Sequence, residues 1–140
     1  MKMISPSTFG IGTDIFEISR LNKKEVLEND AFLNRIFSKR ELDYCFSKKT
    51  PLQRLASRFS GKEAMIKALG DAGIQFSEYN KIEIINNEIG APLVYLNHPL
   101  LKDFVAKLSL SHSEKYALAF ALVLKKETKR AKKHRHSNKT

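Results

Sequence analysis

The segment from Arg58 to Gly70 places a carboxylate inside the apolar stripe of a predicted helix, and few folds accept such a placement. At about 100° per residue, the apolar side chains of residues 52–66 gather on one face, and Glu63 lies near the middle of that arc. A buried carboxylate without a partner would be strongly disfavoured. One interpretation is an ordinary ion pair with Lys67, one turn further on; the other is that Glu63 belongs to a site that holds a cation.

The ends of this helix can be predicted from residue types. Thr50 is a suitable N-cap, Pro51 suits the first turn, and Gln53 completes a capping box. Gly70 suits the C-terminal stop. We therefore predict one long helix over residues 51–69.

A second unusual segment, residues 9–18, alternates apolar residues with glycines at the period of a strand. Glycines inside a strand often mark close approach by a ligand or by another backbone. Gly10, Gly12 and Asp14 share one face of the predicted strand, so the two positions before Asp14 on that face carry no side chain. Asp14 is either a cap or turn residue or, with Glu63, a partial ligand shell for Mg²⁺, which takes few protein carboxylates and adds water and phosphate oxygens.

Two further strands joined by a tight polar turn are predicted over residues 108–123. Ser109, Ser111 and Ser113 share one face of the first strand, and His112 lies on the other. A histidine at a strand end is commonly a hydrogen-bonded structural residue, but an imidazole and adjacent hydroxyls also bind phosphate. On the residues alone, both interpretations of His112 stay open.

The remaining segments predict shorter elements. These are helices over 20–28 and 30–37, a helix that begins at a capping box of Ser38 and Glu41, strands over 81–85 and 93–96, and a helix over 99–108. Helices and strands do not alternate regularly, which favours an α+β fold over a doubly wound one.

Together these segments, in this order and at this spacing, resemble the holo-acyl-carrier-protein synthase family of 4'-phosphopantetheinyl transferases. The resemblance covers residues 9 to about 124. The matching blocks are Gly10-Ile11-Gly12-Thr13-Asp14, then Arg58-Phe59 with Lys62-Glu63-Ala64 and Lys67-Ala68, then Ile82-Glu83-Ile84 before Gly90-Ala91-Pro92, and Ser109-Leu110-Ser111-His112-Ser113. A Lys-Glu-Ala triplet alone carries little information, whereas the ordered set of blocks is specific. Two departures, at Gly61 and Ala91, do not touch the carboxylate pair.

The resemblance implies a 4'-phosphopantetheinyl transferase-like α+β fold, with an antiparallel sheet packed against one long and several short helices. It also implies that 4'-phosphopantetheine passes from coenzyme A to a serine of apo-acyl carrier protein. Mg²⁺ is then the expected cofactor, held by Asp14 and Glu63. The expected catalytic residues are Asp14, Glu63 and Lys67, and the base that deprotonates the serine is either Glu63 or a metal-bound water.

The resemblance also implies two binding surfaces and an assembly. Coenzyme A is expected to contact Arg58, Lys67, Gly70, Pro92, Ser111 and His112. The acidic carrier protein is expected to dock on Arg20, Lys24, Phe32, Arg35 and Phe59. Similar proteins act as homotrimers with active sites between neighbours, and we expect the same here. A carrier domain of a specialised synthase is an alternative acceptor for the same chemistry.

The composition agrees with a small cytoplasmic enzyme. At 140 residues we expect a single transferase domain over 1–124, followed by a basic, flexible tail over 125–140. The tail holds eight Lys or Arg against one Glu, and thus most of the net charge of +10. A nucleic-acid-binding module is therefore the competing class, but residues 1–124 contain no recognised motif for it. A single cysteine and no membrane-spanning run favour a reducing cytoplasm and no membrane association.

Overall fold

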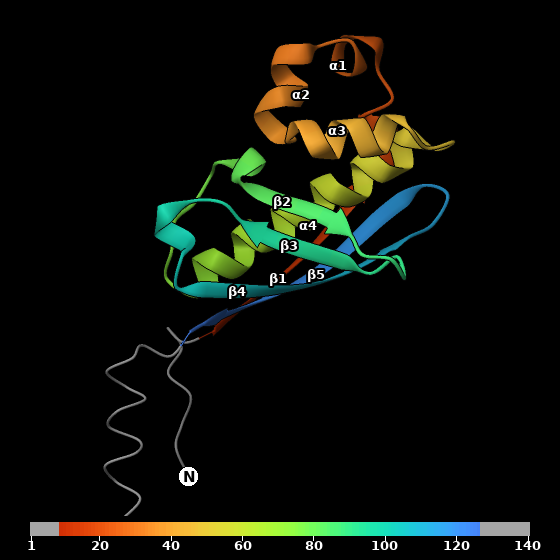
Figure 1. Ribbon diagram of the computed structural model, residues 1–140. Coiled ribbons are helices and arrows are strands. Elements are labelled where there is room, and N and C mark those ends of the chain that lie inside the picture. Colours follow the sequence, from red (N-terminus) through yellow and green to blue (C-terminus); the bar gives the residue numbers. More distant parts are fainter. Residues whose placement is uncertain (1–8, 127–140) are drawn as a thin grey trace, which may run out of the picture.

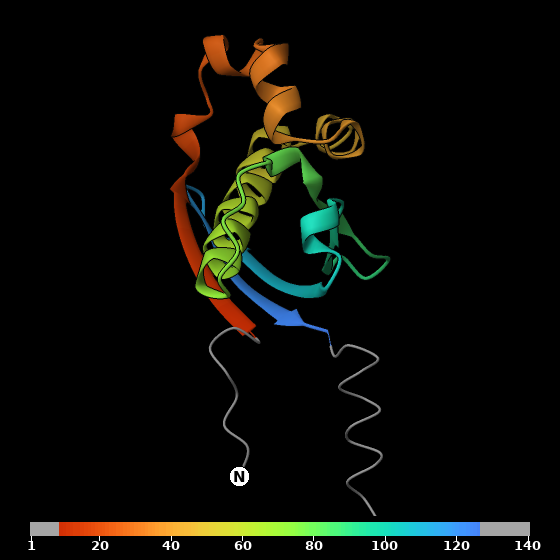
Figure 2. The same cartoon turned by 90° about the vertical axis from the view of Figure 1, so that its left-hand side faces the viewer.

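Helix α4 (Pro51–Asp71) is the element around which the chain is arranged (Figure 1). The computed structural model describes residues 9–126. A three-stranded antiparallel sheet, in the order β1 (Phe9–Glu17), β5 (Tyr116–Lys125) and β4 (Phe104–His112), curves around one side of the helix (Figure 2). A second antiparallel pair, β2 (Ile82–Asn86) and β3 (Pro92–Leu96), lies along another side. The predicted α+β class and its layout around one long helix are confirmed.

Three short helices pack at the N-terminal end of α4: α1 (Lys24–Leu27), α2 (Asp30–Ile36) and α3 (Lys39–Phe46) (Figure 1). The predicted capping box of α3 is confirmed, because the Ser38 hydroxyl accepts from the Glu41 amide and the Glu41 carboxylate accepts from the Ser38 amide. Short 3₁₀ turns complete the order: η1 (Ile18–Arg20), η2 (Tyr79–Lys81) and η3 (Pro99–Leu101).

The predicted helix over residues 20–28 is confirmed only for Lys24–Leu27. The chain forms only the turn η1 and then, after an extended Lys23 (φ −130°, ψ 135°), the single turn α1. Ile18 and Leu21 are both buried, and their spacing of three suits a 3₁₀ turn that places both in the core. Burial of this pair, rather than helix propensity, sets the local structure.

The predicted helix over residues 99–108 is wrong. Only η3 is helical, and β4 already begins at Phe104. From Phe104 onward, side chains in the core alternate with exposed ones, and every residue to His112 is paired with β5. Pairing with a distant strand thus overrides the local pattern.

The two ends of α4 differ from their prediction. Thr50 makes no side-chain capping bond, so the predicted N-terminal capping box is wrong. The helix continues past Gly70 to Asp71, and Gly73, just beyond the C-cap residue Ala72, adopts a positive φ of 93°. The Ile74 amide donates to the Leu69 carbonyl (2.8 Å), closing a Schellman motif. The stop therefore lies three residues beyond the glycine that we expected to form it.

Glycines in β1 let the strand approach the backbone of α4. A Cβ atom on Gly10 would lie 2.0 Å from the carbonyl oxygen of Ala68, and one on Gly12 would lie 2.0 Å from that of Ala64. Neither contact is physically possible for a larger residue. The face of β1 that carries Gly10 and Gly12 is thus packed against the backbone of α4. This close packing places Asp14 against the middle of α4.

Two expectations concern the limits of the chain. Within residues 9–126, no helix is both long and apolar enough to cross a membrane. The predicted tail over 125–140 lies outside the described residues except for its first two, of which Lys125 ends β5.

Candidate functional site

Asp14 lies on the face of β1 that meets α4, and two side chains of that helix contact it. The Ser60 hydroxyl donates to Asp14 Oδ2 at 3.0 Å. Lys67 Nζ lies 3.5 Å from Asp14 Oδ1 and donates to the Thr13 carbonyl at 3.0 Å. The Asp14 side chain is only 15% exposed, so it is a fixed carboxylate rather than a solvated turn residue.

Glu63 lies on the same face of α4, three residues after Ser60 and four before Lys67. Its Oε1 accepts a hydrogen bond from the Tyr79 hydroxyl at 2.8 Å. Burial, this bond and the nearby charges of Glu63 and Asp14 raise the pKa of Tyr79 to about 12. In the described part of the chain Lys67 pairs with Asp14 and not with Glu63, so the simple i,i+4 ion pair is wrong.

The two carboxylates fit a hard divalent cation of the Mg²⁺ type. Residues 9–126 contain no group of three or more His, Cys, Asp or Glu side chains that could hold a metal ion by themselves. Mg²⁺ needs no such group, because it is usually held by one or two carboxylates together with water and substrate phosphates. One oxygen of each carboxylate is fixed by a hydroxyl, on Ser60 and Tyr79.

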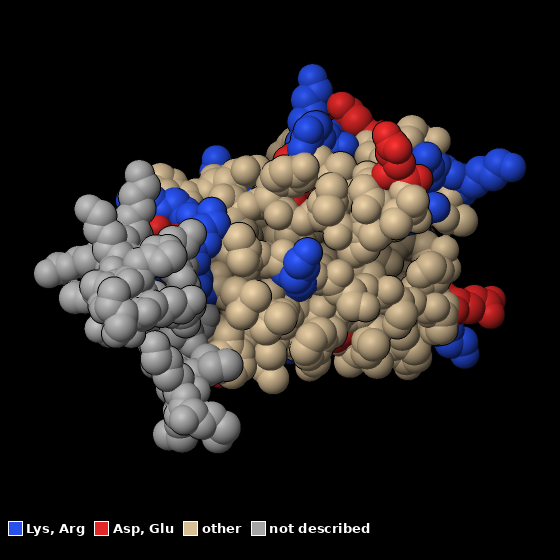
Figure 3. All heavy atoms as spheres, turned by 60° about the horizontal axis from the view of Figure 1, so that its bottom comes forward, with Lys and Arg blue, Asp and Glu red and all other residues tan. Residues whose placement is uncertain are grey.

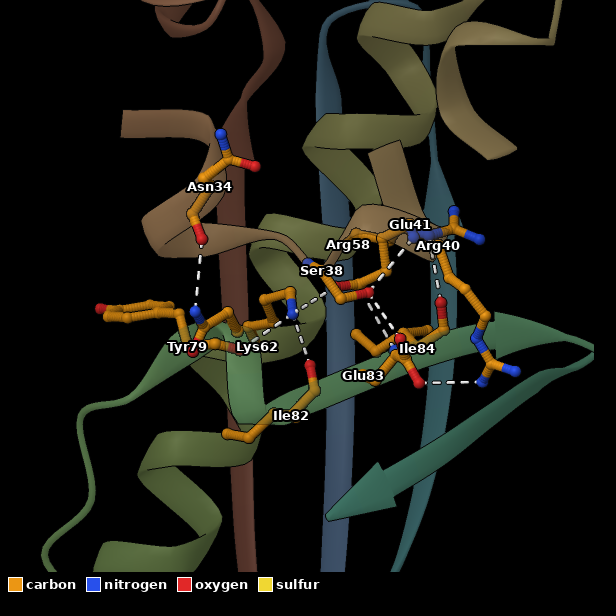
Figure 4. Close-up of polar contacts among 11 residues, drawn as sticks. Asn34, Ser38, Arg40, Glu41, Arg58, Lys62, Tyr79, Ile82, Glu83 and Ile84 are labelled. Atoms are coloured by element: carbon orange, nitrogen blue, oxygen red, sulfur yellow. Dashed lines mark hydrogen bonds and ion pairs between the residues drawn. The ribbon is translucent and has the colours of Figure 1, made fainter. Parts of the chain in front are cut away.

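The structure reveals a buried ion pair that the sequence reasoning missed (Figure 4). Lys62 Nζ donates to Glu41 Oε1 at 2.8 Å, to the Tyr79 carbonyl at 2.9 Å and to the Ile82 carbonyl. Both charged side chains are 0% exposed. Burial lowers the pKa of Lys62, while the charge of Glu41 acts against that shift. This pair joins α4, α3, η2 and β2 at one point.

A second polar cluster holds α3 to β2 (Figure 4). Glu83 accepts from the Ser38 hydroxyl at 2.6 Å and from Arg40 Nη2 at 2.8 Å. Burial alone would raise the pKa of Glu83, but these two hydrogen bonds and the positive charges of Arg40 and Lys62 together outweigh burial and lower the pKa. The block at residues 82–84 therefore has a structural role here, because Glu83 anchors β2 to the start of α3.

A cavity of about 270 Å³ lies between the N-terminal half of α4 and the ends of β2 and β4. Its lining brings together three of the residues predicted to bind coenzyme A, which are Arg58, Pro92 and His112, and adds Arg54. Arg58 is buried, and its guanidinium is fixed by the Asn86 side chain (2.7 Å) and the Ile84 carbonyl (3.2 Å). Two guanidinium groups and an imidazole make this a cavity for an anionic group.

The other residues predicted for coenzyme A lie elsewhere. Ser111 is exposed on the opposite face of β4, because successive residues of a strand alternate. Gly70 is exposed near the C-terminal end of α4 and does not line the cavity. Lys67 lies beside Asp14. Within one chain, the predicted set is thus divided between the cavity, the carboxylates and the surface.

The cavity and the carboxylate pair lie on different sides of α4. Arg58 and Glu63 are five residues apart, which corresponds to about 140° around the helix axis and roughly 7.5 Å along it. Arg58 accordingly contacts β2, whereas Glu63 contacts Tyr79. A single chain does not turn both groups toward one space.

The residues predicted to dock the carrier protein gather near the short helices. Arg20, Lys24 and Arg35 are exposed on η1, α1 and α2. Phe32 and Phe59 are half-buried in the hydrophobic cluster beneath them. This arrangement combines apolar surface with exposed positive side chains, which are interspersed with exposed Glu25, Glu28 and Asp30.

Comparison with known proteins decides the family. A model of the 4'-phosphopantetheinyl transferase superfamily matches residues 10–121 of this chain. The chain belongs to this superfamily. The phosphopantetheinyl transferase expected from the sequence motifs is therefore confirmed.

Relatives of this transferase are named holo-acyl-carrier-protein synthases. The chain is 42% identical over 119 residues to the protein of Protochlamydia amoebophila, covering 82% of this chain and 97% of the relative. It is 38% identical over 115 residues to that of Chloroherpeton thalassium, covering 81% and 95%.

Two solved structures of such synthases match the fold of this transferase. The Bacillus anthracis enzyme in complex with CoA (3',5'-ADP) matches with a TM-score of 0.66 and 29% identity, covering 84% of this chain and 96% of that one. The Helicobacter pylori enzyme in complex with coenzyme A matches with a TM-score of 0.67 and 28% identity, covering 82% and 98%.

Three residues that shape the site were missed from the sequence. Ser60 could have been found, because its spacing of three from Glu63 places both on one helical face. Lys62 lies in one of the matching blocks, but its burial was missed, since its partner Glu41 comes from a different helix. Tyr79 follows Glu63 by sixteen residues across a loop, and only the folded chain shows that they meet.

Proposed function

We propose that this transferase moves 4'-phosphopantetheine from coenzyme A to a serine of apo-acyl carrier protein, releasing adenosine 3',5'-bisphosphate. The observation that carries the proposal is that Asp14 on β1 and Glu63 on α4 lie together at the β1–α4 contact, each fixed by a hydroxyl, while another side of α4 borders a cavity lined by basic groups. Attack of a hydroxyl on a pyrophosphate depends on positioning and on neutralising charge on the phosphate oxygens. A cation held by the carboxylates would neutralise this charge, and the basic groups of the cavity would position the substrate phosphates.

Asp14 and Glu63 are the residues that would hold Mg²⁺. When bound, the ion supplies charge neutralisation for the pyrophosphate oxygens. Lys67 is 57% exposed and lies 3.5 Å from Asp14, so its ammonium is available to a phosphate next to the carboxylates. Arg58 and His112 bind the nucleotide phosphates in the cavity, and Pro92 borders the base. Because Asn86 already fixes the Arg58 guanidinium, this group needs little reorganisation on binding.

The carrier protein docks on the basic surface formed by Arg20, Lys24 and Arg35. Such a surface steers an acidic partner and raises its encounter rate. Phe32 and Phe59 supply adjacent apolar contact. A carrier domain of a specialised synthase would dock on the same surface and undergo the same reaction. The preferred acceptor is therefore the one that binds this surface more tightly.

We also propose that the active form is a homotrimer with sites shared between neighbours. The outer face of the sheet β1-β5-β4 carries large apolar side chains that are 41–64% exposed: Ile11, Ile15, Leu118, Phe120 and Leu124. Figure 3 brings the lower side of the molecule forward and shows a broad, largely uncharged area, with a basic side chain within it and other charged atoms near its margin. An apolar patch of this kind marks an interaction site. A neighbour on this face also explains how a cavity and a carboxylate pair that diverge on one chain serve one substrate.

Two further points complete the proposal. Residues 1–124 form the transferase domain, and the basic tail after it is not needed for the chemistry. The enzyme works in the reducing cytoplasm, a proposal supported by a single cysteine that is free and buried, Cys45.

The test is a mass assay with apo-acyl carrier protein, coenzyme A and Mg²⁺. We expect the carrier to gain one phosphopantetheine group. Asp14→Ala and Glu63→Ala should each abolish the gain while circular dichroism stays unchanged, because each removes a metal-binding carboxylate and no core contact. Near wild-type turnover of either variant at saturating Mg²⁺ would show that the metal assignment is wrong.

A further inference from the structure

The hydroxyl of Tyr79 is a polar group at the site to which the proposed reaction assigns no role. It donates to Glu63 Oε1 at 2.8 Å. In the part of the chain that the structure describes, Oε2 of Glu63 accepts no hydrogen bond. The bond therefore fixes one oxygen of the carboxylate and leaves the other available.

Tyr79 is itself held from two sides, independently of Glu63. Its carbonyl accepts from Lys62 Nζ at 2.9 Å, and Lys62 is locked by the buried pair with Glu41 (Figure 4). Its ring stacks on that of Phe59, with centroids 6.0 Å apart and planes 5° from parallel. Because the ring is constrained, its hydroxyl keeps a fixed position and can hold the flexible Glu63 side chain in one orientation.

The two carboxylates of the site differ in how they are oriented. Asp14 is short, lies on a strand, and is contacted from α4 by Ser60 and Lys67. Glu63 has a longer side chain with more rotatable bonds, and the partner that orients it comes from η2. A phenol suits this task because it is a neutral donor, so it orients the carboxylate without cancelling its charge. A lysine or arginine at the same place would compete with a cation.

We infer that Tyr79 is a positioning residue of this enzyme, whose hydroxyl orients Glu63 toward the divalent cation that Glu63 and Asp14 hold. The inference rests on the proposed function, and it adds a residue to it. Hydrogen bonds to metal-binding carboxylates from outside the ligand set commonly change metal affinity by about 10–100-fold. Tyr79 acts through Glu63 and need not touch the substrate.

The experiment measures Mn²⁺ binding to the purified full chain by electron paramagnetic resonance of the free ion. Mn²⁺ is a suitable probe because it shares with Mg²⁺ a preference for carboxylate ligands. Tyr79→Phe keeps the stacked ring and removes only the hydroxyl, and we expect its Mn²⁺ dissociation constant to rise at least about 10-fold. In the transfer assay, the Mg²⁺ concentration for half-maximal rate should rise by a similar factor, with KM for coenzyme A at saturating Mg²⁺ within about twofold of wild type.

Two further variants bracket the result. Glu63→Gln should bind Mn²⁺ no better than Tyr79→Phe, because it removes the carboxylate that Tyr79 orients. Tyr95→Phe deletes a hydroxyl of the same kind from an exposed tyrosine on β3 and should leave the dissociation constant unchanged.

The outcomes separate this inference from the proposed function. A Tyr79→Phe protein that binds Mn²⁺ as tightly as wild type overturns the inference, while transfer by the wild type leaves the proposed function standing. A lower melting temperature with unchanged Mn²⁺ affinity has the same meaning, since it assigns Tyr79 to packing alone. A wild type that neither binds Mn²⁺ nor transfers phosphopantetheine overturns both.

Discussion

Where β1 pairs with β5, from Gly10 to Asp14, the two faces of the sheet carry different kinds of side chain. On the inner face, β5 presents small buried residues to α4, and β1 presents glycines: Ala117, Ala119, Ala121, Val123, Gly10 and Gly12. On the outer face, the same two strands present Ile11, Ile15, Leu118, Phe120 and Leu124, all substantially exposed. In a soluble monomer, the face packed on the core would carry the large apolar residues and the solvated face would carry polar ones.

The difference indicates that the two faces pack against different surfaces: the inner face against α4 and the outer face against a neighbouring subunit. Gly10 and Gly12 carry no side chain because the backbone of α4 lies against them, and this contact sets Asp14 beside Ser60. Outer positions are large because, on our proposal, another copy of the chain covers them. Burying such a side chain completely from water is worth about 1.5–3 kcal/mol. These five are already about half buried, so each would add roughly half of that, and together they can drive association. The inner face therefore builds the subunit and the outer face builds the assembly.

The largest effect should come from filling the inner face. Gly12→Ala would place a methyl group 2.0 Å from the Ala64 carbonyl oxygen, so β1 would have to move away from α4. We expect the free energy of unfolding to fall by about 3 kcal/mol or more, measured by urea denaturation. Thr13→Ala, one residue along but on the outer face, is the control and should cost much less. Equal losses for the two variants would contradict the distinction between the faces.

The next largest effect should come from placing a charge on the outer face. We expect Phe120→Asp to abolish the trimer in sedimentation velocity and to lose most transfer activity, because the shared site is then incomplete. Its circular dichroism should stay that of the wild type, since Phe120 faces away from the core.

Leu100→Asp introduces the same charge at another exposed apolar residue, on η3, and is the matched control. It should remain assembled and active. A Phe120→Asp protein that also remains assembled would remove the outer face as the interface.

A smaller effect should separate docking from assembly. Arg20→Glu reverses a charge just beyond β1, and we expect a several-fold higher KM for the carrier protein with little change in KM for coenzyme A. Added salt should weaken the wild type more than the variant, because the Debye length is only about 8 Å at physiological ionic strength. Lys102→Glu is the control, as an exposed lysine distant in sequence from the short helices. A similar rise in KM for both variants would mean that net charge, and not this surface, attracts the carrier.

The sequence predicted those parts of the molecule whose cause is local. The strand with Gly10 and Gly12, the long helix and the capping box of Ser38 and Glu41 all rest on short-range rules, and all are present. Residue order also predicted the family, and with it the pairing of Asp14 with the face of α4 that carries Glu63.

The parts that could not be predicted depend on contacts between distant segments. Lys62 is buried because Glu41 and two backbone carbonyls from other segments surround its ammonium group. The chain after Pro99 reads as a helix until pairing with β5 makes it a strand. Tyr79 and Glu63 meet only because a loop after α4 returns along the helix. In each case, the local structure is stabilised by contact with a residue or strand that is distant in the sequence.

The smallest effect should come from deleting the chain after Lys126. Both faces of the sheet, the carboxylate pair and the cavity lie within residues 9–125, so the comparison of faces predicts that nothing essential is removed. We expect kcat, both KM values and the sedimentation coefficient corrected for mass to stay within about twofold of wild type at physiological salt, where long-range charge effects are screened. The deleted segment carries much of the net charge of +10, so the salt dependence of carrier turnover should change modestly. A large loss of carrier turnover with an intact trimer would instead identify the tail as a second docking element, and the surface around Arg20 would then account for only part of carrier binding.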